Sequence, residues 1–329
     1  MRPFLLLSFT FLTVVGCNRQ PTSVPPAVIK VGHLRLLSAS PLFLAVQENL
    51  FQQQGVATEL RVIASGPEGN EALAAGNINI AFSILPSLLV ANARAIPPDL
   101  VSIYGSSIDS PEINDHRILV AKDSKIKRFI DLRGKKIAVV GWPGMTSDVL
   151  ELLDTLEQVG LTPKDLMLVG MPHGDMIAAL EAKVVDAAAS AEPFVGMGQE
   201  KGTVRVLDER GGFYYNGQVE VTTYLARRSW VDANLDATRG FVRSLEQARQ
   251  RMANRQSFCD KSAPNFNMKS SPRIDFIAIT SAQCLGLHLA PIQPAPTEQG
   301  LRHVAEQLVK RKVIPQVPDN LSRLVYVVN

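Results

Sequence analysis

The chain has 329 residues, of which 46% are hydrophobic and 20% are charged, and its formal net charge is +3. These are ordinary values for a globular protein, and about 300 residues are enough for two domains. A charge balance this close to zero gives no support for a nucleic-acid partner.

The first 16 residues have the pattern of an export signal. Arg2 precedes an apolar run over residues 4–15, which is too short to span a bilayer but is typical of a secretory signal. Gly16 before Cys17 resembles the lipobox of bacterial lipoproteins, in which the signal is cut before the cysteine and its thiol carries diacylglycerol. The sequence therefore predicts a lipoprotein signal peptide over residues 1–16 and a lipid anchor at Cys17. An ordinary signal peptide with an incidental cysteine is the alternative.

Residues 17–27 contain three prolines and no apolar pattern, and they predict a tether between the anchor and the folded protein. No second long apolar segment follows, so we expect no transmembrane helix. Export also bears on the remaining cysteines, Cys259 and Cys284, which form an even pair in a compartment where disulfides persist. We predict a disulfide between them. A metal site that uses both cysteines and His288 is the alternative, but it lacks a fourth ligand and any C-x-x-C spacing.

Strands and helices alternate after the tether. Strands are predicted over residues 28–33, 60–64 and 78–83, and helices over residues 41–51 and 71–75. A polar turn over residues 65–70 leads into the second helix. A strand over residues 118–121 is expected to cross to a second lobe.

A strand, a tight loop and a helix form the clearest unit of this second lobe. The apolar run over residues 136–140 stops at Gly141, and helical spacing begins behind Thr146, Ser147 and Asp148, which are helix-capping residue types. Free backbone N–H groups and the positive end of the helix dipole meet at such a junction, which suits a small anionic or polar ligand. Because every α/β domain has such junctions, a purely structural role is the alternative.

The rest of the second lobe and the C-terminal part have weaker signals. Asp175 is expected to cap a helix that leads into a strand over residues 185–190. A return strand is predicted over residues 219–226, followed by helices near residues 235–253, 275–287 and 297–312 that pack back on the first lobe.

The two halves of the chain also resemble each other. An offset of 107 residues places Asn79 on Asp186 and Ser83 on Ser190, and it aligns a helix end, a turn and a strand in both halves. The alternative is a chance alignment of alanine-rich helices. Two copies predict an α/β fold with a first lobe over residues 28–117, on which residues 227–329 pack, and a second lobe over residues 118–226. The cleft between them would lie beyond the carboxyl ends of the strands, and two hinge crossings would allow closure.

Five short stretches support a family resemblance over residues 28–230. They are residues 41–45 (PLFLA), 74–81 (AAGNINIA), 131–139 (DLRGKKIAV), 160–165 (GLTPKD) and 179–187 (ALEAKVVDA). The chain thus resembles the solute-binding proteins of sulfonate, nitrate, taurine and thiamine-pyrimidine importers, which have the type II periplasmic binding fold. The resemblance implies a monomeric extracytoplasmic protein, without a cofactor, that captures a small polar or anionic nitrogen or sulfur compound. It also implies delivery of that compound to an ABC permease with its ATPase.

Other functions have less support in the sequence than the one this resemblance implies. The chain contains no dinucleotide or nucleoside-triphosphate fingerprint, no G-x-S-x-G motif and no metal spacing among its histidines, so it is not expected to be an enzyme. A cytosolic branch of the same fold makes the thiamine pyrimidine, but its cysteine-rich motif is absent here and an export signal is present. An exported sensor module without a permease remains a further alternative.

The resemblance and the internal symmetry assign ligand contacts to loops that follow strands. The candidates are Ser38, Ser40, Ser65, Glu68, Ser83, Trp142, Gly144, Met145, Thr146, Glu192 and Asn216. The serines and Thr146 have helix capping or strand ends as alternative roles. Arg35 is the only cation near these loops, and a desolvated Glu192 beside a bound anion would be costly. We therefore expect a ligand that also carries an N–H or cationic group, such as an amino-sulfonate or a pyrimidine.

Overall fold

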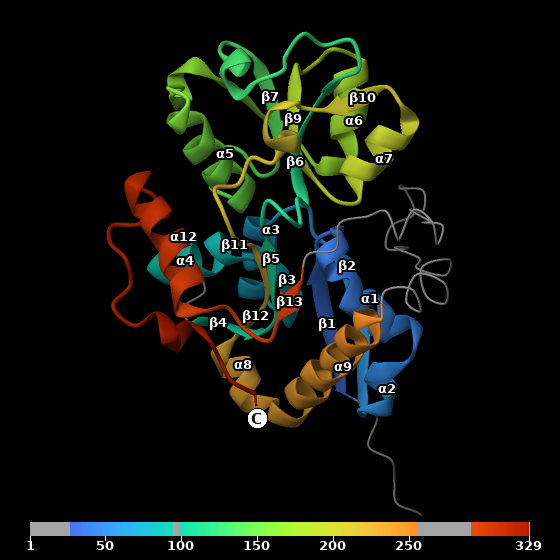
Figure 1. The fold of residues 1–329 in the computed structure, drawn as a ribbon. Coiled ribbons are helices and arrows are strands. Elements are labelled where there is room, and N and C mark those ends of the chain that lie inside the picture. Colours follow the sequence, from blue (N-terminus) through green and yellow to red (C-terminus); the bar gives the residue numbers. More distant parts are fainter. Residues whose placement is uncertain (1–26, 95–98, 255–290, 329) are drawn as a thin grey trace, which may run out of the picture.

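The computed structural model describes residues 27–94, 99–254 and 291–328, which form two parts, one above the other in Figure 1. Each part is built on a five-stranded sheet. A third sheet of three short strands lies where the two parts meet.

The first sheet has the strand order β2-β1-β3-β12-β4. Strand β1 runs parallel to β2 and β3, whereas β12 runs antiparallel to β3 and β4. The strands are β1 (Ala27–His33), β2 (Val56–Val62), β3 (Ile80–Ile84), β4 (Leu100–Tyr104) and β12 (Thr222–Arg227). We call the part of the molecule built on this sheet the first lobe.

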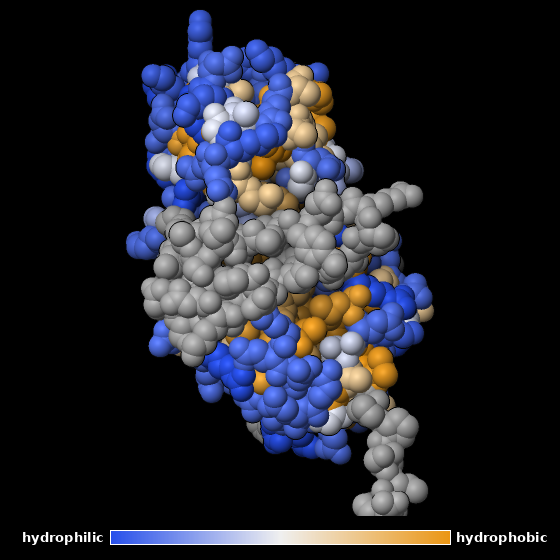
Figure 2. Space-filling view, turned by 90° about the vertical axis from the view of Figure 1, so that its right-hand side faces the viewer, coloured by the Kyte–Doolittle hydropathy of each residue, from blue (hydrophilic) through white to orange (hydrophobic). Residues whose placement is uncertain are grey.

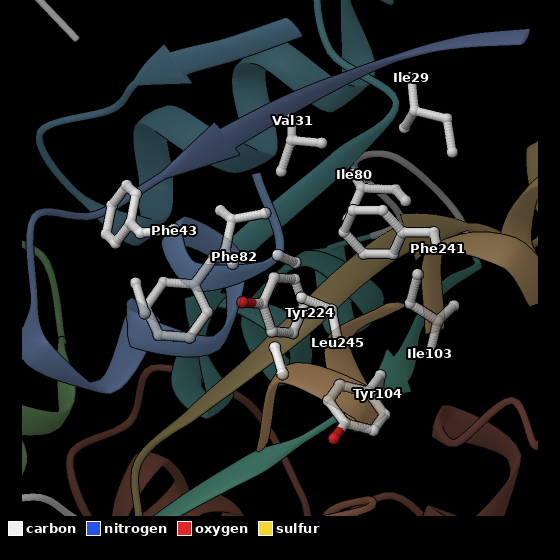
Figure 3. Close-up of a cluster of buried hydrophobic side chains, with 14 of the residues drawn as sticks. Ile29, Val31, Phe43, Ile80, Phe82, Ile103, Tyr104, Tyr224, Phe241 and Leu245 are labelled. Atoms are coloured by element: carbon white, nitrogen blue, oxygen red, sulfur yellow. The ribbon is translucent and has the colours of Figure 1, made fainter. Parts of the chain in front are cut away.

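Helices cover both faces of the first sheet, which explains why β3 and β4 are buried along their whole length. One face packs on α1 (Ser40–Gln47), α2 (Leu50–Gln53) and α9 (Leu235–Ala253), through a core that Figure 3 shows around Phe82, Tyr224 and Phe241. The other face packs on α3 (Gly66–Ala74), α4 (Leu85–Arg94) and α12 (Glu298–Lys310). Helix α8 (Arg228–Ala233) joins β12 to α9.

The second sheet has the strand order β10-β6-β9-β7-β8 and forms the second lobe. Its strands are β6 (His116–Ala121), β7 (Lys136–Val139), β8 (Met167–Gly170), β9 (Ala187–Ala191) and β10 (Val204–Val206). Helix α5 (Ser147–Gln158) covers one face, and α6 (His173–Glu181) and α7 (Phe194–Lys201) cover the other.

On the face shown in Figure 2, hydrophilic residues cover most of the lower end of the molecule, and a hydrophobic patch lies above them, towards the junction of the two parts.

The chain crosses twice between the lobes, and each crossing passes through the small third sheet. The first crossing leaves β4 through β5 (Ser106–Asp109) and enters β6, and the second leaves β10 through β11 (Val219–Glu220) and enters β12. Strand β5 pairs antiparallel with β11 and with β13 (Ile292–Gln293). The two crossings are therefore hydrogen-bonded to each other, which is the arrangement of a shared hinge.

Most expected elements exist, and the differences have local causes. Strand β2 begins at Val56 rather than at residue 60, because its parallel register with β1 pairs Val56 with Ala27. Asn49 has a left-handed backbone (φ 54) that separates α1 from α2, where one helix was expected. The expected return strand is two strands, and β12 pairs within the first sheet although its residues were expected to end the second lobe.

Several expectations concern segments outside the described residues. These are the signal peptide with Cys17, the pair Cys259 and Cys284, and the helix near residues 275–287. Within the described ranges, no helix is long and apolar enough to cross a membrane. In those ranges no group of three or more His, Cys, Asp or Glu side chains is arranged so that it could hold a metal ion.

Candidate functional site

A cavity of about 400 Å³ lies between the two lobes, at the carboxyl ends of β1, β2 and β3 in the first lobe and of β7 in the second. This is the place where open α/β sheets bind ligands. The first lobe and the second crossing contribute Leu34, Arg35, Leu36, Val62, Ile63, Ala64, Ser65, Gly66, Ile84 and Val221. The second lobe contributes His116, Val140, Thr146, Asp148, Pro172, His173, Gly174, Asp175 and Phe194.

Three helices begin at this cavity. Helix α3 starts behind Ser65, whose hydroxyl accepts a hydrogen bond from the Glu68 amide, and α5 starts behind Thr146, whose hydroxyl accepts one from the Val149 amide. Helix α6 starts behind Pro172, which offers no side-chain cap, and the Asp175 amide in its first turn donates to the Pro172 carbonyl at 3.1 Å. The first N–H groups of a helix have no partner within it and carry positive partial charge. Their convergence from both lobes makes the cavity suited to an anionic or strongly polar group.

Arg35 provides a full positive charge in the same cavity. Its side chain is half-buried, and its buried Nε has no hydrogen-bond partner in the described ranges. Among the described residues, no carboxylate lies within ion-pair distance of this guanidinium. Burial lowers the pKa of Arg35 from its usual value, which is the effect expected of a cation that lacks a counter-charge. A bound anion would supply that counter-charge.

The remaining walls of the cavity are mainly apolar. They are formed by Leu34, Leu36, Val62, Ile63, Ile84, Val140, Phe194 and Val221. A mainly apolar pocket with a few convergent polar groups is the usual form of a small-molecule site. The cavity therefore fits an amphiphilic molecule with an anionic head and an apolar remainder.

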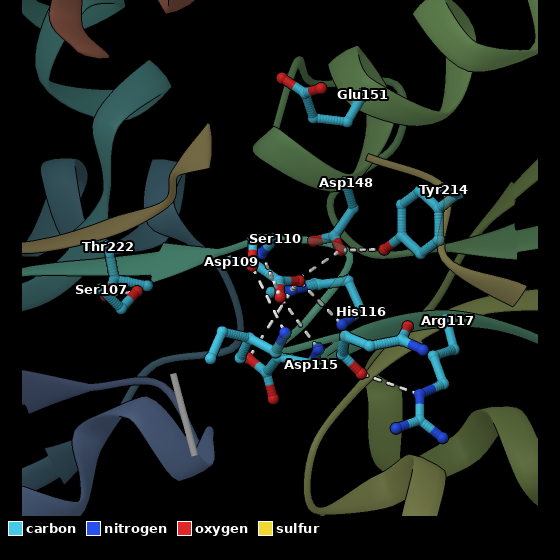
Figure 4. Close-up of polar contacts among 12 residues, drawn as sticks. Ser107, Asp109, Ser110, Asp115, His116, Arg117, Asp148, Glu151, Tyr214 and Thr222 are labelled. Atoms are coloured by element: carbon cyan, nitrogen blue, oxygen red, sulfur yellow. Dashed lines mark hydrogen bonds and ion pairs between the residues drawn. The ribbon is translucent and has the colours of Figure 1, made fainter. Parts of the chain in front are cut away.

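A buried polar network lies at one end of the cavity, next to the first crossing (Figure 4). Asp109 accepts hydrogen bonds through Oδ2 from the backbone amide of His116 at 3.0 Å and from its Nδ1 at 2.8 Å. Asp148, at the start of α5, lies 3.8 Å from His116 Nε2 and accepts a hydrogen bond from the Tyr214 hydroxyl. The network thus joins the first crossing, α5 and the segment that leads into the second crossing.

The charge of His116 follows from this network. Burial opposes the charged imidazolium, but the hydrogen bond to Asp109 and the charges of Asp115 and Asp148 outweigh burial and raise the pKa of His116 to about 9. The imidazolium is therefore charged at neutral pH, and its charge is shared between Asp109 at 2.8 Å and Asp148 at 3.8 Å.

His173 is the second histidine on the cavity wall, and its pKa is shifted in the opposite direction to that of His116. Burial lowers its pKa to about 4, so the ring is neutral at neutral pH. The ring stacks on Phe194, with centroids 5.7 Å apart, and its Nδ1 lies 3.4 Å from the Ser190 hydroxyl. A neutral imidazole can donate or accept a single hydrogen bond with a ligand.

Two of the residues expected from the sequence, Ser65 and Thr146, line the cavity. The hydroxyl of Ser40 donates to the Leu37 carbonyl, and the carboxylate of Glu68 accepts from the Ala64 amide at 2.7 Å, so both are engaged locally. Ser38 and Ser83 are buried but do not line the cavity, and the Ser83 hydroxyl has no hydrogen-bond partner within the part of the chain that the structure describes.

The remaining candidates also lie off the cavity wall. Trp142 and Met145 pack against the core of the second lobe, Gly144 approaches Pro67 of the first lobe, and Asn216 is exposed. Glu192 is buried, and its carboxylate accepts a hydrogen bond from the Gly196 amide at 2.9 Å.

Sequence reasoning missed His116, Asp148, His173 and Asp175 as cavity residues. Asp175 does not cap α6 from outside, because it lies within the first turn and is exposed at the cavity. The position of His116 gives no signal in the sequence, because its partners come from separate elements.

Comparison with known proteins gives a consistent result. Residues 22–264 match the model of the NMT1-like family. The chain is 27% identical over 251 residues to a protein of Escherichia coli (strain K12) named as an aliphatic sulfonates-binding protein, covering 75% of this chain and 74% of the relative.

Solved structures show the same fold. The alkanesulfonate-binding protein SsuA of Xanthomonas axonopodis pv. citri, bound to MOPS, superposes with a TM-score of 0.73 at 21% identity, over 93% of this chain and 100% of the other. The periplasmic nitrate-binding protein NrtA of Synechocystis PCC 6803 gives 0.65 at 14% identity, over 91% and 84%. The predicted periplasmic binding fold is therefore confirmed.

Proposed function

Because the chain belongs to the NMT1-like family, we propose that it is an exported solute-binding protein that captures a small organic anion between its lobes and delivers it to an ABC importer. The relative from Escherichia coli, named for aliphatic sulfonates, supports this role. So do the periplasmic binding fold and the position of the cavity between the lobes. In this role the protein binds and releases its ligand without changing it.

The guanidinium of Arg35, which has no ion-pair partner among the described residues, is the observation that favours an anion. It shares one cavity with the amino ends of α3, α5 and α6, and the other walls are mainly apolar. A sulfonate or similar head would take its charge-assisted hydrogen bonds from Arg35 and the helix amides. A short alkyl or ring group would then replace water along Ile63, Ile84 and Phe194.

The expected N–H or cationic group on the ligand has less support than the anionic head. That expectation depended on Glu192, whose carboxylate is directed to the Gly196 amide and is absent from the cavity wall. Asp175 is the exposed carboxylate that an ammonium group could reach. An amino-sulfonate therefore remains a candidate ligand, with Asp175 in place of Glu192.

The lipid anchor and the monomeric state belong to the same proposal. The lipobox-like Cys17 would tether the protein to the membrane through residues 17–27, facing the periplasm or the cell exterior. Growth in labelled palmitate followed by detergent partitioning tests the anchor. Wild-type protein should enter the detergent phase with label and Cys17→Ser should not, and equal partitioning of the two would contradict it.

Calorimetric titration of delipidated protein tests the function. The panel consists of alkanesulfonates, taurine, nitrate and aminopyrimidines, and the proposal expects at least one sulfonate to bind in the micromolar range or tighter. Recovery of unchanged ligand by mass spectrometry is the second expected result. Failure of every anion to bind, or turnover of a bound ligand, would refute the proposal.

A further inference from the structure

An acidic face of helix α5 meets hydrogen-bonding and basic side chains at helix α12, across the lobes and beside the cleft. Helix α5 belongs to the second lobe and contributes Glu151, Asp154 and Glu157, which lie three residues apart and so share one face. Helix α12 packs on α4 of the first lobe, and it contributes, together with its C-cap residue Arg311, the hydrogen-bonding and basic side chains His303, Gln307, Lys310 and Arg311. Figure 1 shows the two helices on the same side of the molecule.

The contacts form a continuous array along both helices. Glu151 Oε1 lies 3.0 Å from His303 Nε2 and 2.8 Å from Gln307 Nε2. Lys310 Nζ lies 2.6 Å from Asp154 Oδ1 and 2.8 Å from Glu157 Oε2. Arg311 Nη1 completes the array at 2.7 Å from Glu157 Oε1. All carboxylates therefore come from one lobe and all cations from an element of the other.

Part of this array is buried, which distinguishes it from ordinary surface ion pairs. The side chain of Glu151 is 3% exposed and that of Arg311 is 8% exposed. A buried carboxylate that loses its partners bears the full cost of desolvation. Separation of α5 from α12 therefore either breaks these contacts or lets water enter between them. The hydrogen bond to Glu151 raises the pKa of His303, as expected for a partner held by a carboxylate.

Helix α5 also contacts the ligand cavity, and helix α12 also contacts the hinge. The amino end of α5 lines the cavity through Thr146 and Asp148. The amino end of α12 is held by Glu220 of the second crossing, whose carboxylate accepts hydrogen bonds from the amide and hydroxyl of Thr297. The array thus lies between the ligand contact at one end of α5 and the hinge at one end of α12.

We propose that the contact between α5 and α12 is an electrostatic clasp that holds the lobes together around the ligand and sets the rate of ligand release. The part of this inference that concerns ligand release rests on the proposed binding function. The part that concerns the attachment of the two lobes to each other does not. Because salt screens exposed charges most, the outer pairs of Lys310 weaken first as ionic strength rises. The buried pairing of Glu151 then limits how far the lobes separate.

Lys310→Met tests the clasp, because methionine keeps the length of the side chain and removes the charge. Lys201→Met is the matched control, since Lys201 pairs with Glu181 at 2.6 Å within the second lobe. Stopped-flow release of the bound sulfonate is measured at low and high ionic strength. Lys310→Met is expected to release ligand about two- to fivefold faster than wild type at low salt, with a smaller salt dependence, and Lys201→Met is expected to match wild type.

A double-mutant cycle with Glu157→Gln separates loss of the contact between Lys310 and Glu157 from a general effect of either substitution on folding. The effects of Lys310→Met and Glu157→Gln should be less than additive, because the two changes remove one shared contact. Equal far-ultraviolet circular dichroism of the variants shows that each is folded. Unchanged release and salt dependence in Lys310→Met, or full additivity in the cycle, would overturn the clasp.

Small-angle scattering of ligand-free protein separates this inference from the proposed function. If the clasp holds the lobes, Lys310→Met has a larger radius of gyration than wild type and Lys201→Met does not, whether or not any sulfonate binds. Absence of ligand binding together with this expansion would refute the binding function and keep the clasp. Tight binding with identical radii and release rates would refute the clasp and keep the function.

Discussion

The backbone amide of Leu37 donates a hydrogen bond to the backbone carbonyl of Glu192, with 3.1 Å between nitrogen and oxygen. Leu37 follows β1 in the first lobe, and Glu192 follows β9 in the second, so this bond joins the lobes at one edge of the cleft. The contact between α5 and α12 joins them elsewhere. The structure is therefore closed around the cavity, and Glu192 contributes to closure through its main chain.

Glu192→Gln is expected to leave ligand affinity within about twofold of wild type. The substitution keeps the backbone bond to Leu37, and an amide oxygen can still accept from Gly196. Burial raises the pKa of Glu192 from its ordinary value, and glutamine keeps the size of this buried side chain without the charge. Calorimetric titration with a bound sulfonate measures the effect. A large change in affinity would show that the carboxylate takes part in ligand binding, as the sequence analysis expected.

Arg35→Met is expected to weaken the binding of an anionic ligand about 10- to 100-fold, the usual range for loss of one charged hydrogen-bond partner. Arg61→Met is the control, because Arg61 is an exposed arginine that pairs with Glu59 at 2.8 Å in the same lobe. Titration of both variants with the same sulfonate measures the difference. Equal affinities for the two variants would exclude Arg35 as the anion partner.

Two glycines of the second lobe should respond differently to alanine. A Cβ at Gly170 would lie 2.3 Å from the backbone oxygen of Trp142, whereas a Cβ at Gly174 would meet only Phe194 Cε1 at 3.6 Å. Gly170→Ala is therefore expected to lower the free energy of unfolding by about 1–3 kcal/mol. Gly174→Ala should keep the stability and reduce affinity, because its methyl group occupies the cavity. Urea denaturation and titration check both, and a stable Gly170→Ala variant would contradict the close approach.

The buried histidines predict a stability maximum near neutral pH. His33 and His173 have a pKa lowered to about 4 by burial, from an ordinary value of 6.5. Their neutral forms favour the folded state above pH 6.5, and this contribution is lost as the pH falls towards 4. The pKa of His116, raised to about 9, has the opposite sign, because its contribution is complete below 6.5 and is lost as the pH rises through about 9.

Asp115 adds to the loss as the pH rises. Burial raises the pKa of its carboxyl from 3.8 to about 8, so the folded protein keeps a proton that the unfolded chain loses, and this contribution falls between about pH 4 and pH 8. Urea unfolding across the pH range should therefore give free energies that fall on both sides of about pH 6–7. His116→Gln should remove part of the alkaline loss. A free energy of unfolding that rises between about pH 7 and 9 would contradict these assignments.

Local patterns predicted the unit around α5 well, because they depend on neighbours in sequence. The strand up to Val139, the turn at Gly141 and the cap at Thr146 follow from short-range chemistry, and all three are present. The family motifs also lie in short stretches of sequence, and for the same reason they predicted the periplasmic binding fold with its two lobes of strands and helices. They identified the cleft edge of each sheet, which is where the cavity lies.

The side chains that face the cavity depend on packing between distant segments, and they were harder to predict. The partners of His116 come from β5 and α5, and the closing contact of Glu192 comes from the first lobe. Strand β2 also shows the limit of prediction from local patterns, because its start is fixed by pairing with β1 rather than by its own apolar residues. No short-range pattern contains these relationships.

The central claim is that the cavity selects an anionic head joined to an apolar group. The most direct test is calorimetric titration of the delipidated protein with butanesulfonate, butanol and butylammonium, which share one alkyl chain, and with methanesulfonate and hexanesulfonate. We predict that the sulfonates bind and that the neutral and cationic analogues do not. Affinity should rise with chain length by up to about 0.8 kcal/mol for each methylene group that becomes buried. Preferential binding of butylammonium or butanol, or equal affinity for all five compounds, would contradict the account.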